Sequence, residues 1–410
     1  MPEVLTVIYL VYMFLAIYFL SLFLLIYFQN RKQFYEIPKI EKNFSLGIVI
    51  PCFNAEKQIG ETIQKLINSE YKNLKQIVVV DDCSTDNTFK IAKSFEKIDK
   101  RVLVVQTPQN TGRAAGAKNF GAKFIKTELI GFTDDDSRPK SDAIPCMIGY
   151  FNDEKVGGVT SRVLVQNKEN LLSKFQAVEY KVIAFARKIL GFIDSIYVTN
   201  GPLSIYRKSV FDEVNGFSMT NWTEDIEITW HIVSKGYGIR MAIPAMVYTI
   251  VPTKFKQWFR QRLRWNVGGI QTINSYKKSF MKNGMLGLFI LPYFVLSWAL
   301  AIFGFCVLVY RIIRMIALRY LGTKMSIEAQ TAILSFNDLN FYPSILVFFG
   351  IVILVFSIFY NVFALLRSRE KEFKNEGIFT LFGYMIFYLT VYPAILIMSI
   401  INFIKGKDKW

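Results

Sequence analysis

Four long runs without a charged residue restrict the fold of this chain more than any other feature. They cover residues 4–28, 285–310, 341–366 and 377–404. Each run exceeds the roughly 20 residues that an α-helix needs to cross the hydrocarbon core of a bilayer. Buried core helices are the alternative, but uncharged runs of this length are typical of membrane spans. We therefore predict a multi-pass membrane protein, with one span before a polar segment and three after it.

The flanking charges predict which side of the membrane the polar segment occupies. The first run has no cationic segment before it and no small-residue cleavage site, which favours a retained anchor over a signal peptide. Arg31, Lys32, Lys39 and Lys42 follow the run directly. The positive-inside rule then places the polar segment in the cytosol. Residues 311–340 would form a loop on the outside, or carry a surface-lying helix over 311–321.

Composition narrows the partners of the chain. Its 49 Lys and Arg against 32 Asp and Glu give a formal net charge of +17. The cations are spread along the sequence, which favours anionic lipid and substrate phosphates over nucleic acid. The cysteines show no CxxC spacing, which indicates reduced thiols in a cytosolic compartment. The single histidine, His231, excludes a multi-histidine metal site within the chain but leaves a carboxylate-bound metal open.

The polar segment alternates predicted strands and helices. Strands are expected at 46–50, 76–80, 102–105 and 129–133, with helices at 59–69 and 88–95. This order predicts an α/β domain containing a parallel sheet, which binds ligands at the carboxyl ends of its strands. Three polar clusters lie at such ends, and they are the loop from Pro51 to Glu56, the pair Asp81 and Asp82, and Asp134-Asp135-Asp136. The chain has no GxGxxG or Walker motif, so a dinucleotide or P-loop site of the usual kind is not predicted.

The carboxylates at these strand ends have two interpretations each. Asp81 and Asp82 either cap a turn or helix, or bind the base and ribose of a nucleotide. Asp134-Asp135-Asp136 is either a solvated acidic turn or a site for a hard divalent cation completed by a diphosphate. We expect Asp134 and Asp136 to face that metal. Three adjacent carboxylates repel one another, which a bound cation would relieve.

Two later motifs provide further candidates. Thr223-Glu224-Asp225 precedes a helical pattern at 226–233, so Thr223 could cap that helix, or Asp225 could act as a general base. Residues 254–265 predict an amphipathic helix on the membrane surface. On this helix, Arg264 can offer a planar fork to a diphosphate and Trp265 can stack on a sugar. Arg262 falls within the apolar arc, so it either snorkels or finds an anionic partner.

In their order, these motifs resemble the family 2 inverting glycosyltransferases over about residues 46–269. They are most similar to the membrane-integrated synthases of cellulose, chitin, hyaluronan and poly-N-acetylglucosamine. The strongest matches are Thr223-Glu224-Asp225, Gln261-Arg262-Leu263-Arg264-Trp265 and the stretch from Gly201 to Arg207. Asp135 replaces a small residue usual in the family, and Arg113 stands where many relatives carry Lys.

The resemblance implies a GT-A domain, a Rossmann-like mixed sheet, joined to transmembrane and interfacial helices. It implies Asp225 as the base with Glu224 beside it, Mg²⁺ or Mn²⁺ on Asp134 and Asp136, and an acceptor site at Gly201, Pro202 and Trp265. The residues it implies for the donor are Pro51, Asn54, Glu56, Asp81, Asp82, Arg113, Lys118, Asp134, Asp135, Asp136, Gln261, Arg262 and Arg264. The expected divisions are an anchor (1–30), the catalytic domain (45–250), interfacial helices (251–283) and a three-helix membrane region (284–410).

The implied activity is transfer from a UDP-sugar, UDP-N-acetylglucosamine or UDP-glucose, to a growing membrane-associated glycan. Processive synthesis is expected, with an accessory membrane subunit or a second copy as further partners. The alternative within the same class is transfer of one sugar to a lipid, either a glycolipid or a polyprenyl phosphate. A non-catalytic scaffold that binds nucleotide or anionic lipid is the alternative from another class.

Overall fold

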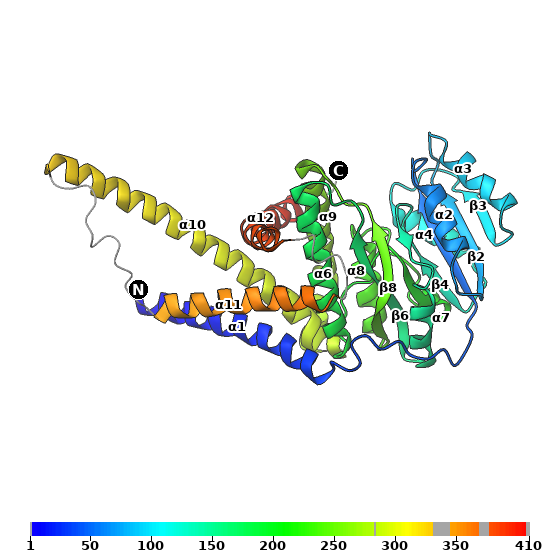
Figure 1. The fold of residues 1–410 in the computed structure, drawn as a ribbon, viewed down its shortest axis with the longest axis horizontal. Coiled ribbons are helices and arrows are strands. Elements are labelled where there is room, and N and C mark those ends of the chain that lie inside the picture. Colours follow the sequence, from blue (N-terminus) through cyan, green and yellow to red (C-terminus); the bar gives the residue numbers. More distant parts are fainter. Residues whose placement is uncertain (1, 283, 331–344, 369–376, 407–410) are drawn as a thin grey trace.

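The computed structural model describes residues 2–282, 284–330, 345–368 and 377–406. Figure 1 shows an α/β unit at one end, from which long helices project away. The strands are β1 (Leu46–Cys52), β2 (Leu74–Asp81), β3 (Val102–Gln106), β4 (Leu129–Phe132), β5 (Arg138–Pro139), β6 (Val156–Val165), β7 (Ser204–Arg207) and β8 (Gly238–Thr249). The predicted strands and their order are therefore correct for the first half of the domain.

Over these ranges the strands form one mixed sheet in the order β3-β2-β1-β4-β7-β6-β8-β5. β1, β2, β3 and β4 are parallel, as predicted. β7 then runs antiparallel to both β4 and β6, and β8 is parallel to β6. The sheet is therefore mixed rather than wholly parallel. The predicted polar clusters follow β1, β2 and β4 at one edge, where a ligand would bind.

Both faces of the sheet are covered, which explains why its strands are continuously apolar. Successive side chains point to opposite faces, so Ile48 and Ile50 enter one core while Val49 enters the other. The helices beside the sheet are α2 (Ile59–Ile67), α3 (Thr88–Ser94), α4 (Ala114–Ala122), α5 (Pro145–Ile148), α6 (Leu171–Gly191), α7 (Lys208–Glu213) and α8 (Glu224–Ser234). α6 begins with a capping box in which Asn170 Oδ1 accepts from the Ser173 amide at 2.8 Å.

The remaining helices form the candidate membrane region. They are α1 (Pro2–Gln29), α9 (Phe255–Tyr276), α10 (Leu291–Glu328), α11 (Ile345–Leu366) and α12 (Ile378–Ile404). Within the described ranges, three helical segments are long and apolar enough to cross a membrane, namely Thr6–Gln29, Leu286–Glu328 and Ile378–Ile404. The fourth predicted run is represented by the shorter apolar stretch Gly350–Leu366, and its residues 341–344 lie outside the described chain.

The predicted outer loop at 311–340 is wrong in its first half. α10 continues without a break to Glu328, so residues 311–328 are helical and the separate surface helix at 311–321 does not exist. The sequence there contains good helix formers and no proline, so the helix propagates past the charges of Arg311 and Arg314. Residues 331–340 of the predicted loop lie outside the described chain.

α9 is longer than its predicted range of 254–265 and connects the two parts of the molecule. It packs against α12, with the Trp258 and Phe387 ring centroids 5.0 Å apart. Trp258 is fully buried in this contact. The apolar arc of the helix is thus covered by protein here, while its opposite side faces the carboxyl ends of the strands.

Candidate active site

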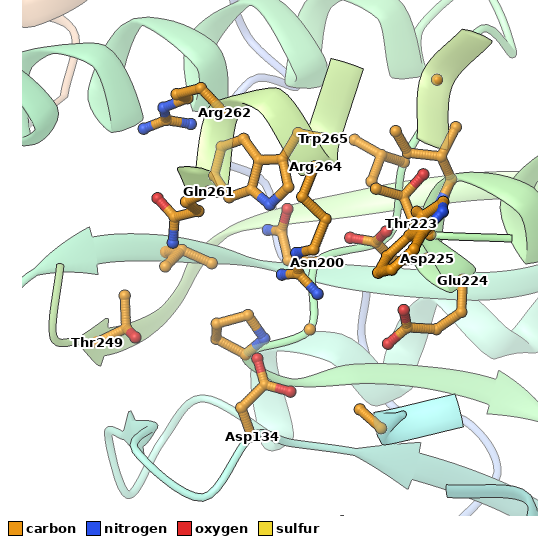
Figure 2. A pocket seen from close by; sticks show the side chains of 18 of the residues that line it. Asp134, Asn200, Thr223, Glu224, Asp225, Thr249, Gln261, Arg262, Arg264 and Trp265 are labelled. Atoms are coloured by element: carbon orange, nitrogen blue, oxygen red, sulfur yellow. Dashed lines mark hydrogen bonds between the residues drawn. The ribbon is translucent and has the colours of Figure 1, made fainter. Parts of the chain in front are cut away.

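A cavity of about 800 Å³ lies between the carboxyl ends of the strands and α6, α8 and α9. It brings together residues that are far apart in the sequence, and its lining includes Pro51, Asp82, Arg113, Lys118, Asp134, Asp135, Asp136, Gly201, Pro202, Glu224, Asp225, Gln261, Arg262, Arg264 and Trp265. Figure 2 shows Arg264 reaching from α9 toward Asp134, with Trp265 beside it and Glu224 and Asp225 on the other side. Tyr293 and Trp298 of the α10 helix and Tyr392 of α12 also line the cavity, so it extends to the membrane helices.

The three aspartates after β4 have different environments. Asp134 lies 3.7 Å from the Lys118 ammonium, and Asp136 Oδ1 accepts a hydrogen bond from Thr249 at 3.3 Å. Burial, together with the charges of Asp136 and Asp134, raises the pKa of Asp135 to about 7. Burial and Asp134 raise the pKa of Asp136 to about 6. The cluster is therefore held with unneutralised negative charge, which a bound cation would stabilise.

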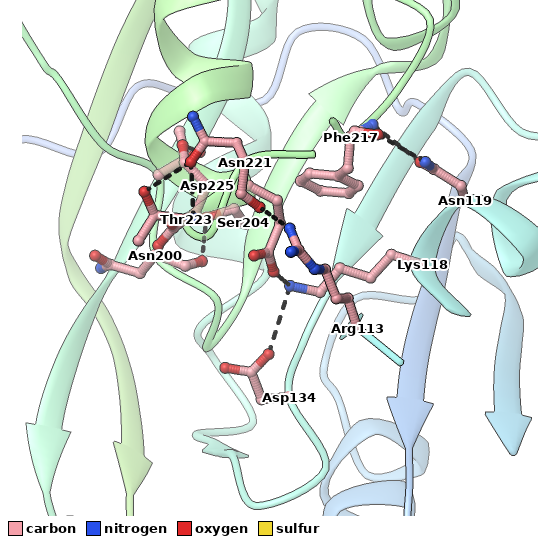
Figure 3. A network of polar contacts seen from close by, with 12 residues as sticks. Arg113, Lys118, Asn119, Asp134, Asn200, Ser204, Phe217, Asn221, Thr223 and Asp225 are labelled. Carbon is pink, nitrogen blue, oxygen red and sulfur yellow. Dashed lines mark hydrogen bonds and ion pairs between the residues drawn. The ribbon is translucent and has the colours of Figure 1, made fainter. Parts of the chain in front are cut away.

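Lys118 connects this cluster to the start of α8. Its side chain is buried, and Nζ lies 2.8 Å from Glu224 Oε1 and 3.7 Å from Asp134 Oδ1 (Figure 3). Burial alone would lower the pKa of Lys118, but the Glu224 and Asp134 carboxylates raise it above the ordinary range. Burial alone would raise the pKa of Glu224, and Lys118 holds it below the ordinary value. Glu224 is thus a fixed anion paired with Lys118.

Asp225 is the neighbouring carboxylate and has the opposite shift. Burial and the Glu224 charge raise its pKa to about 6, although Lys118 and Arg264 partly offset them. Its Oδ1 accepts the Ile226 amide at 2.9 Å, and Asp225 lines the cavity wall. Thr223 occupies the N-cap position of α8 but makes no side-chain cap, because its hydroxyl donates to Asn221 at 3.3 Å. Thr223 is therefore at the predicted N-cap position, with Glu224 and Asp225 in the first turn, but without a capping hydrogen bond.

The two arginines of the 261–265 segment differ. Arg264 is exposed and lines the cavity, and its charge lowers the pKa of Glu224 and Asp225. Arg262 is buried and forms an ion pair with Glu179 at 2.6 Å, so the predicted anionic partner exists. Gln261 and Trp265 are half-buried in the cavity wall. Arg264 is therefore better placed than Arg262 to reach a diphosphate.

Several predicted donor residues organise loops. Asp82 lines the cavity, but its carboxylate accepts from the Thr107 hydroxyl at 2.8 Å and from the Thr111 amide and hydroxyl. Arg113 Nη1 donates to three carbonyls of the 219–221 loop, of which Figure 3 shows that of Asn221, and its guanidinium stacks on Trp222. The predicted residues that fall outside the described cavity lining are Asn54, Glu56 and Asp81.

Those outer residues have structural partners in the neighbouring loop. Asn54 Oδ1 accepts the Thr85 amide at 2.8 Å, and Glu56 Oε2 accepts the Asn87 amide at 3.1 Å. Asp81 is fully buried and accepts from Gln106 at 2.7 Å. The contacts of Asn54 and Glu56 join the loops after β1 and β2, and that of Asp81 joins the ends of β2 and β3. Their predicted donor contacts stay predictions.

Gly201 is required by a close approach. A Cβ at this position would collide with the Asp134 carboxylate, so a larger residue would displace that side chain. The following Leu203 has a φ of +68°, which turns the loop sharply before β7. Gly201 and Pro202 therefore shape the cavity through their backbone.

Sequence reasoning missed several residues of the cavity. Glu179, Arg187 and Asn200 line it, and the Arg187 guanidinium donates to Asn200 Oδ1. Arg187 is buried, and within the described chain no carboxylate lies in ion-pair contact with it. Thr249 at the end of β8 was also missed. None of these residues lies in a motif, and only the tertiary packing of α6 and β8 brings them to the cavity.

Comparisons with known proteins agree with this geometry. The family model described as "Glycosyltransferase like family 2" matches residues 44–268, more than half of the chain. The chain belongs to the family 2 glycosyltransferases. This membership confirms the predicted family, and the mixed sheet with its helices confirms the predicted fold class.

Two groups of relatives extend the comparison. A poly-beta-1,6-N-acetyl-D-glucosamine synthase of Staphylococcus epidermidis is 26% identical over 367 residues, covering 88% of this chain and 84% of that protein. One from Staphylococcus aureus (strain COL) is 27% identical over 266 residues, covering 64% of this chain and 63% of that protein. Among solved structures, the mannosyltransferase PcManGT from Pyrobaculum calidifontis, in complex with GDP-Man and Mn2+, has a TM-score of 0.59 at 14% identity and covers 97% of this chain and 99% of that one. That likeness shows the fold.

The residues of this glycosyltransferase fit a divalent cation bound together with a donor. The described ranges contain no group of three or more His, Cys, Asp or Glu side chains placed to hold a metal by themselves. Asp134 and Asp136 nevertheless both line the cavity and offer hard oxygen ligands. Burial and the Asp134 charge raise the pKa of Asp136, so a bound cation would stabilise its ionised form. A diphosphate would have to supply the remaining oxygens.

Proposed function

We propose that this enzyme transfers N-acetylglucosamine, with inversion, from UDP-N-acetylglucosamine to a growing membrane-associated β-glycan. The observation that carries the proposal is the single cavity in which Asp134, Asp136, Asp225, Arg264 and Trp265 meet beside the membrane helices. The names of the staphylococcal relatives support the choice of sugar. The match to the Staphylococcus epidermidis synthase covers 88% of this chain and 84% of that protein, so it extends past the catalytic domain. This extent supports polymer synthesis.

The proposed base is Asp225. Its pKa of about 6 lies above that of an ordinary aspartate, so it is a stronger base while remaining ionised at neutral pH. It removes the proton from the acceptor hydroxyl as that oxygen attacks the anomeric carbon and the bond to UDP breaks. Glu224, held ionised by Lys118, keeps the pKa of Asp225 raised. Asp225 therefore has both the position and the basicity for this step.

The opposite side of the cavity would bind the leaving group. Arg264 is exposed to the cavity and can donate two parallel hydrogen bonds to phosphate oxygens. Asp134 and Asp136 would hold a Mg²⁺ or Mn²⁺ ion, which when bound offsets negative charge on the diphosphate. Lys118 adds a fixed positive charge 3.7 Å from Asp134. These positive groups would thus shield the negative charge of UDP from the anionic base.

Trp265 and the aromatic wall behind it would bind the acceptor. Trp265 is half-buried, and Tyr293, Phe294, Trp298 and Tyr392 continue the lining toward α10 and α12. Aromatic faces bind sugar rings through their apolar C–H groups, which allows a glycan to slide. We propose a multi-pass arrangement with the catalytic domain in the cytosol, where the nucleotide sugar would be available. The proposal includes α11 as a further span.

A donor screen with product analysis tests the proposal. The full-length chain in lipid nanodiscs is incubated with Mg²⁺ or Mn²⁺ and either UDP-N-acetylglucosamine, UDP-glucose or GDP-mannose. We expect UDP release only with the first donor, together with products that grow by one N-acetylhexosamine mass. A single-sugar glycolipid product would favour the lipid-acceptor alternative. Absence of UDP release, with or without the metal, would contradict the proposed activity.

A further inference from the structure

α9 carries a buried arginine, Arg262, beside Trp265, the residue proposed to bind the acceptor. Arg262 is 1% exposed, whereas Arg264, two residues further on, is exposed to the cavity. Both belong to the segment that the family resemblance assigns to the donor. Burial of a guanidinium is costly unless a carboxylate and further hydrogen bonds compensate it. The structure supplies that compensation from two other helices.

The first partner of Arg262 is Glu179 of α6. Arg262 Nη2 lies 2.6 Å from Glu179 Oε2, and Glu179 is itself only 5% exposed. Glu179 has a second partner, Tyr388 of α12, whose hydroxyl donates to the same Oε2 atom at 2.6 Å. The buried Glu179 and Arg262 and the half-buried Tyr388 thus form one cluster that joins α6, α9 and α12. Trp258 packs on the Tyr388 ring, with their centroids 5.9 Å apart, and closes the cluster from the side.

The guanidinium of Arg262 also lies over Trp265. The Arg262 Cζ atom is 4.0 Å from the centroid of the indole ring, compared with 5.9 Å from the centroid of Trp258. A guanidinium that is desolvated and placed over an aromatic face attracts it through a cation–π interaction. Because Glu179 and Tyr388 fix the guanidinium, they also fix the plane against which Trp265 rests.

We infer that Arg262 is a positioning residue for Trp265. In this inference α12 sets the orientation of the Trp265 ring through Tyr388 and Glu179. The inference rests on the proposed function, in which Trp265 binds the acceptor sugar. It differs from the predicted role of Arg262 in donor binding. The Arg262 Nε atom has no partner among the described residues, so donor binding through that atom is the competing outcome of the test.

Three conservative variants test the cluster. Glu179→Gln removes the charge, Arg262→Lys keeps the charge but loses the planar face, and Tyr388→Phe removes one hydroxyl. The matched control is Tyr276→Phe, which removes a similar hydrogen bond at the other end of α9, where the Tyr276 hydroxyl donates to Glu227 at 3.0 Å. Each full-length variant in nanodiscs is assayed for the donor KM from UDP release, the acceptor KM for an N-acetylglucosamine oligosaccharide, and product length.

We expect Glu179→Gln and Arg262→Lys to raise the acceptor KM by about tenfold and to shorten the products, as loss of a desolvated cation–π contact predicts. The donor KM should stay within about twofold, and Tyr276→Phe should behave as wild type. If Glu179→Gln does not fold, Tyr388→Phe is the milder variant that decides, with a smaller change in the same direction.

Two results would overturn the inference. One is a raised donor KM in Arg262→Lys with an unchanged acceptor KM, which would make Arg262 a donor ligand. The other is an equal loss in all variants including the control, which would make the cluster merely structural. Failure of the wild type to consume UDP-N-acetylglucosamine would instead refute the proposed donor, and the variants would then be compared with the donor that the wild type does use.

Discussion

Replacement of Lys118 by Met removes the central positive charge of the cavity and affects both stability and the pH profile. The Lys118 ammonium lies 2.8 Å from Glu224 and 3.7 Å from Asp134. At an effective dielectric constant of about 20, these separations correspond to attractions of roughly 6 and 4 kcal/mol, from which the cost of desolvation must be subtracted. Removing one member of a buried pair destabilises by about 3–5 kcal/mol. We therefore expect Lys118→Met to lower the free energy of unfolding at pH 7 by that amount.

The same variant should change the dependence of stability on pH. Lys118 holds the pKa of Glu224 below its ordinary value, so this pair stabilises the fold above the unfolded-state pKa and is lost as pH falls through the lower folded-state pKa. In the variant, Glu224 is buried without its partner and becomes protonated more easily. The difference in unfolding free energy between wild type and variant should therefore shrink as the pH is lowered below about 4.

Activity reports the same change independently. Asp225 must be ionised to act as a base, so wild-type activity should fall as the pH drops below its pKa of about 6. Lys118 lowers that pKa through its own charge, so at pH values where Glu224 stays ionised its removal should move the acidic limb of the activity profile to higher pH. The assays are chemical denaturation of the protein in detergent and UDP release between pH 5 and pH 9.

An exposed pair with the same geometry is the control. Lys93 lies 2.8 Å from Glu96, but their side chains are 47% and 25% exposed, so Lys93→Met should cost at most about 1 kcal/mol. Lys118→Arg, which keeps the charge, should retain much of the stability. Equal stability and an unshifted pH profile in Lys118→Met would refute the reasoning.

Three further predictions concern the cavity. Chelation of divalent cations should abolish UDP release, and Mg²⁺ or Mn²⁺ should restore it in the wild type but only weakly in Asp134→Asn, as titration with each metal would show. Gly201→Ala should lower kcat at least tenfold with a normal fold, because its Cβ would displace the Asp134 carboxylate; wild-type kcat would contradict the close approach. Trp265→Ala should weaken acceptor binding by about 1–2 kcal/mol while the donor KM changes little, and an effect on the donor alone would contradict its assignment.

The sequence predicted the parts of the fold that depend on local patterns. β1, β2 and β3 are continuous β-branched runs, and α2 places Ile59, Ile63 and Leu66 on one face. The apolar runs of α1 and α12 were equally clear. These features follow from hydrophobic periodicity within one element. The antiparallel insertion of β7 does not, because strand order depends on contacts between residues far apart in the chain.

The site residues that belong to sequence motifs were predictable. Those that only tertiary packing brings to the cavity were not. Asp134, Asp225 and Arg264 were expected to meet, and they line one cavity. Glu179 and Arg187 lie in an amphipathic helix without any motif, so their charges resembled those of an exposed face. The continuation of α10 past Arg311 was also missed, because helix propensity outweighed a cluster of charges.

The most direct test of the account is a paired measurement on Asp225→Asn. This substitution keeps the shape of the side chain and removes its basicity. The account predicts that UDP-N-acetylglucosamine binds to the variant with nearly wild-type affinity in calorimetry, while sugar transfer falls by about 10²–10⁴-fold. Retained transfer, or a parallel loss of donor binding, would contradict the claim that Asp225 is the base in a cavity assembled around one donor.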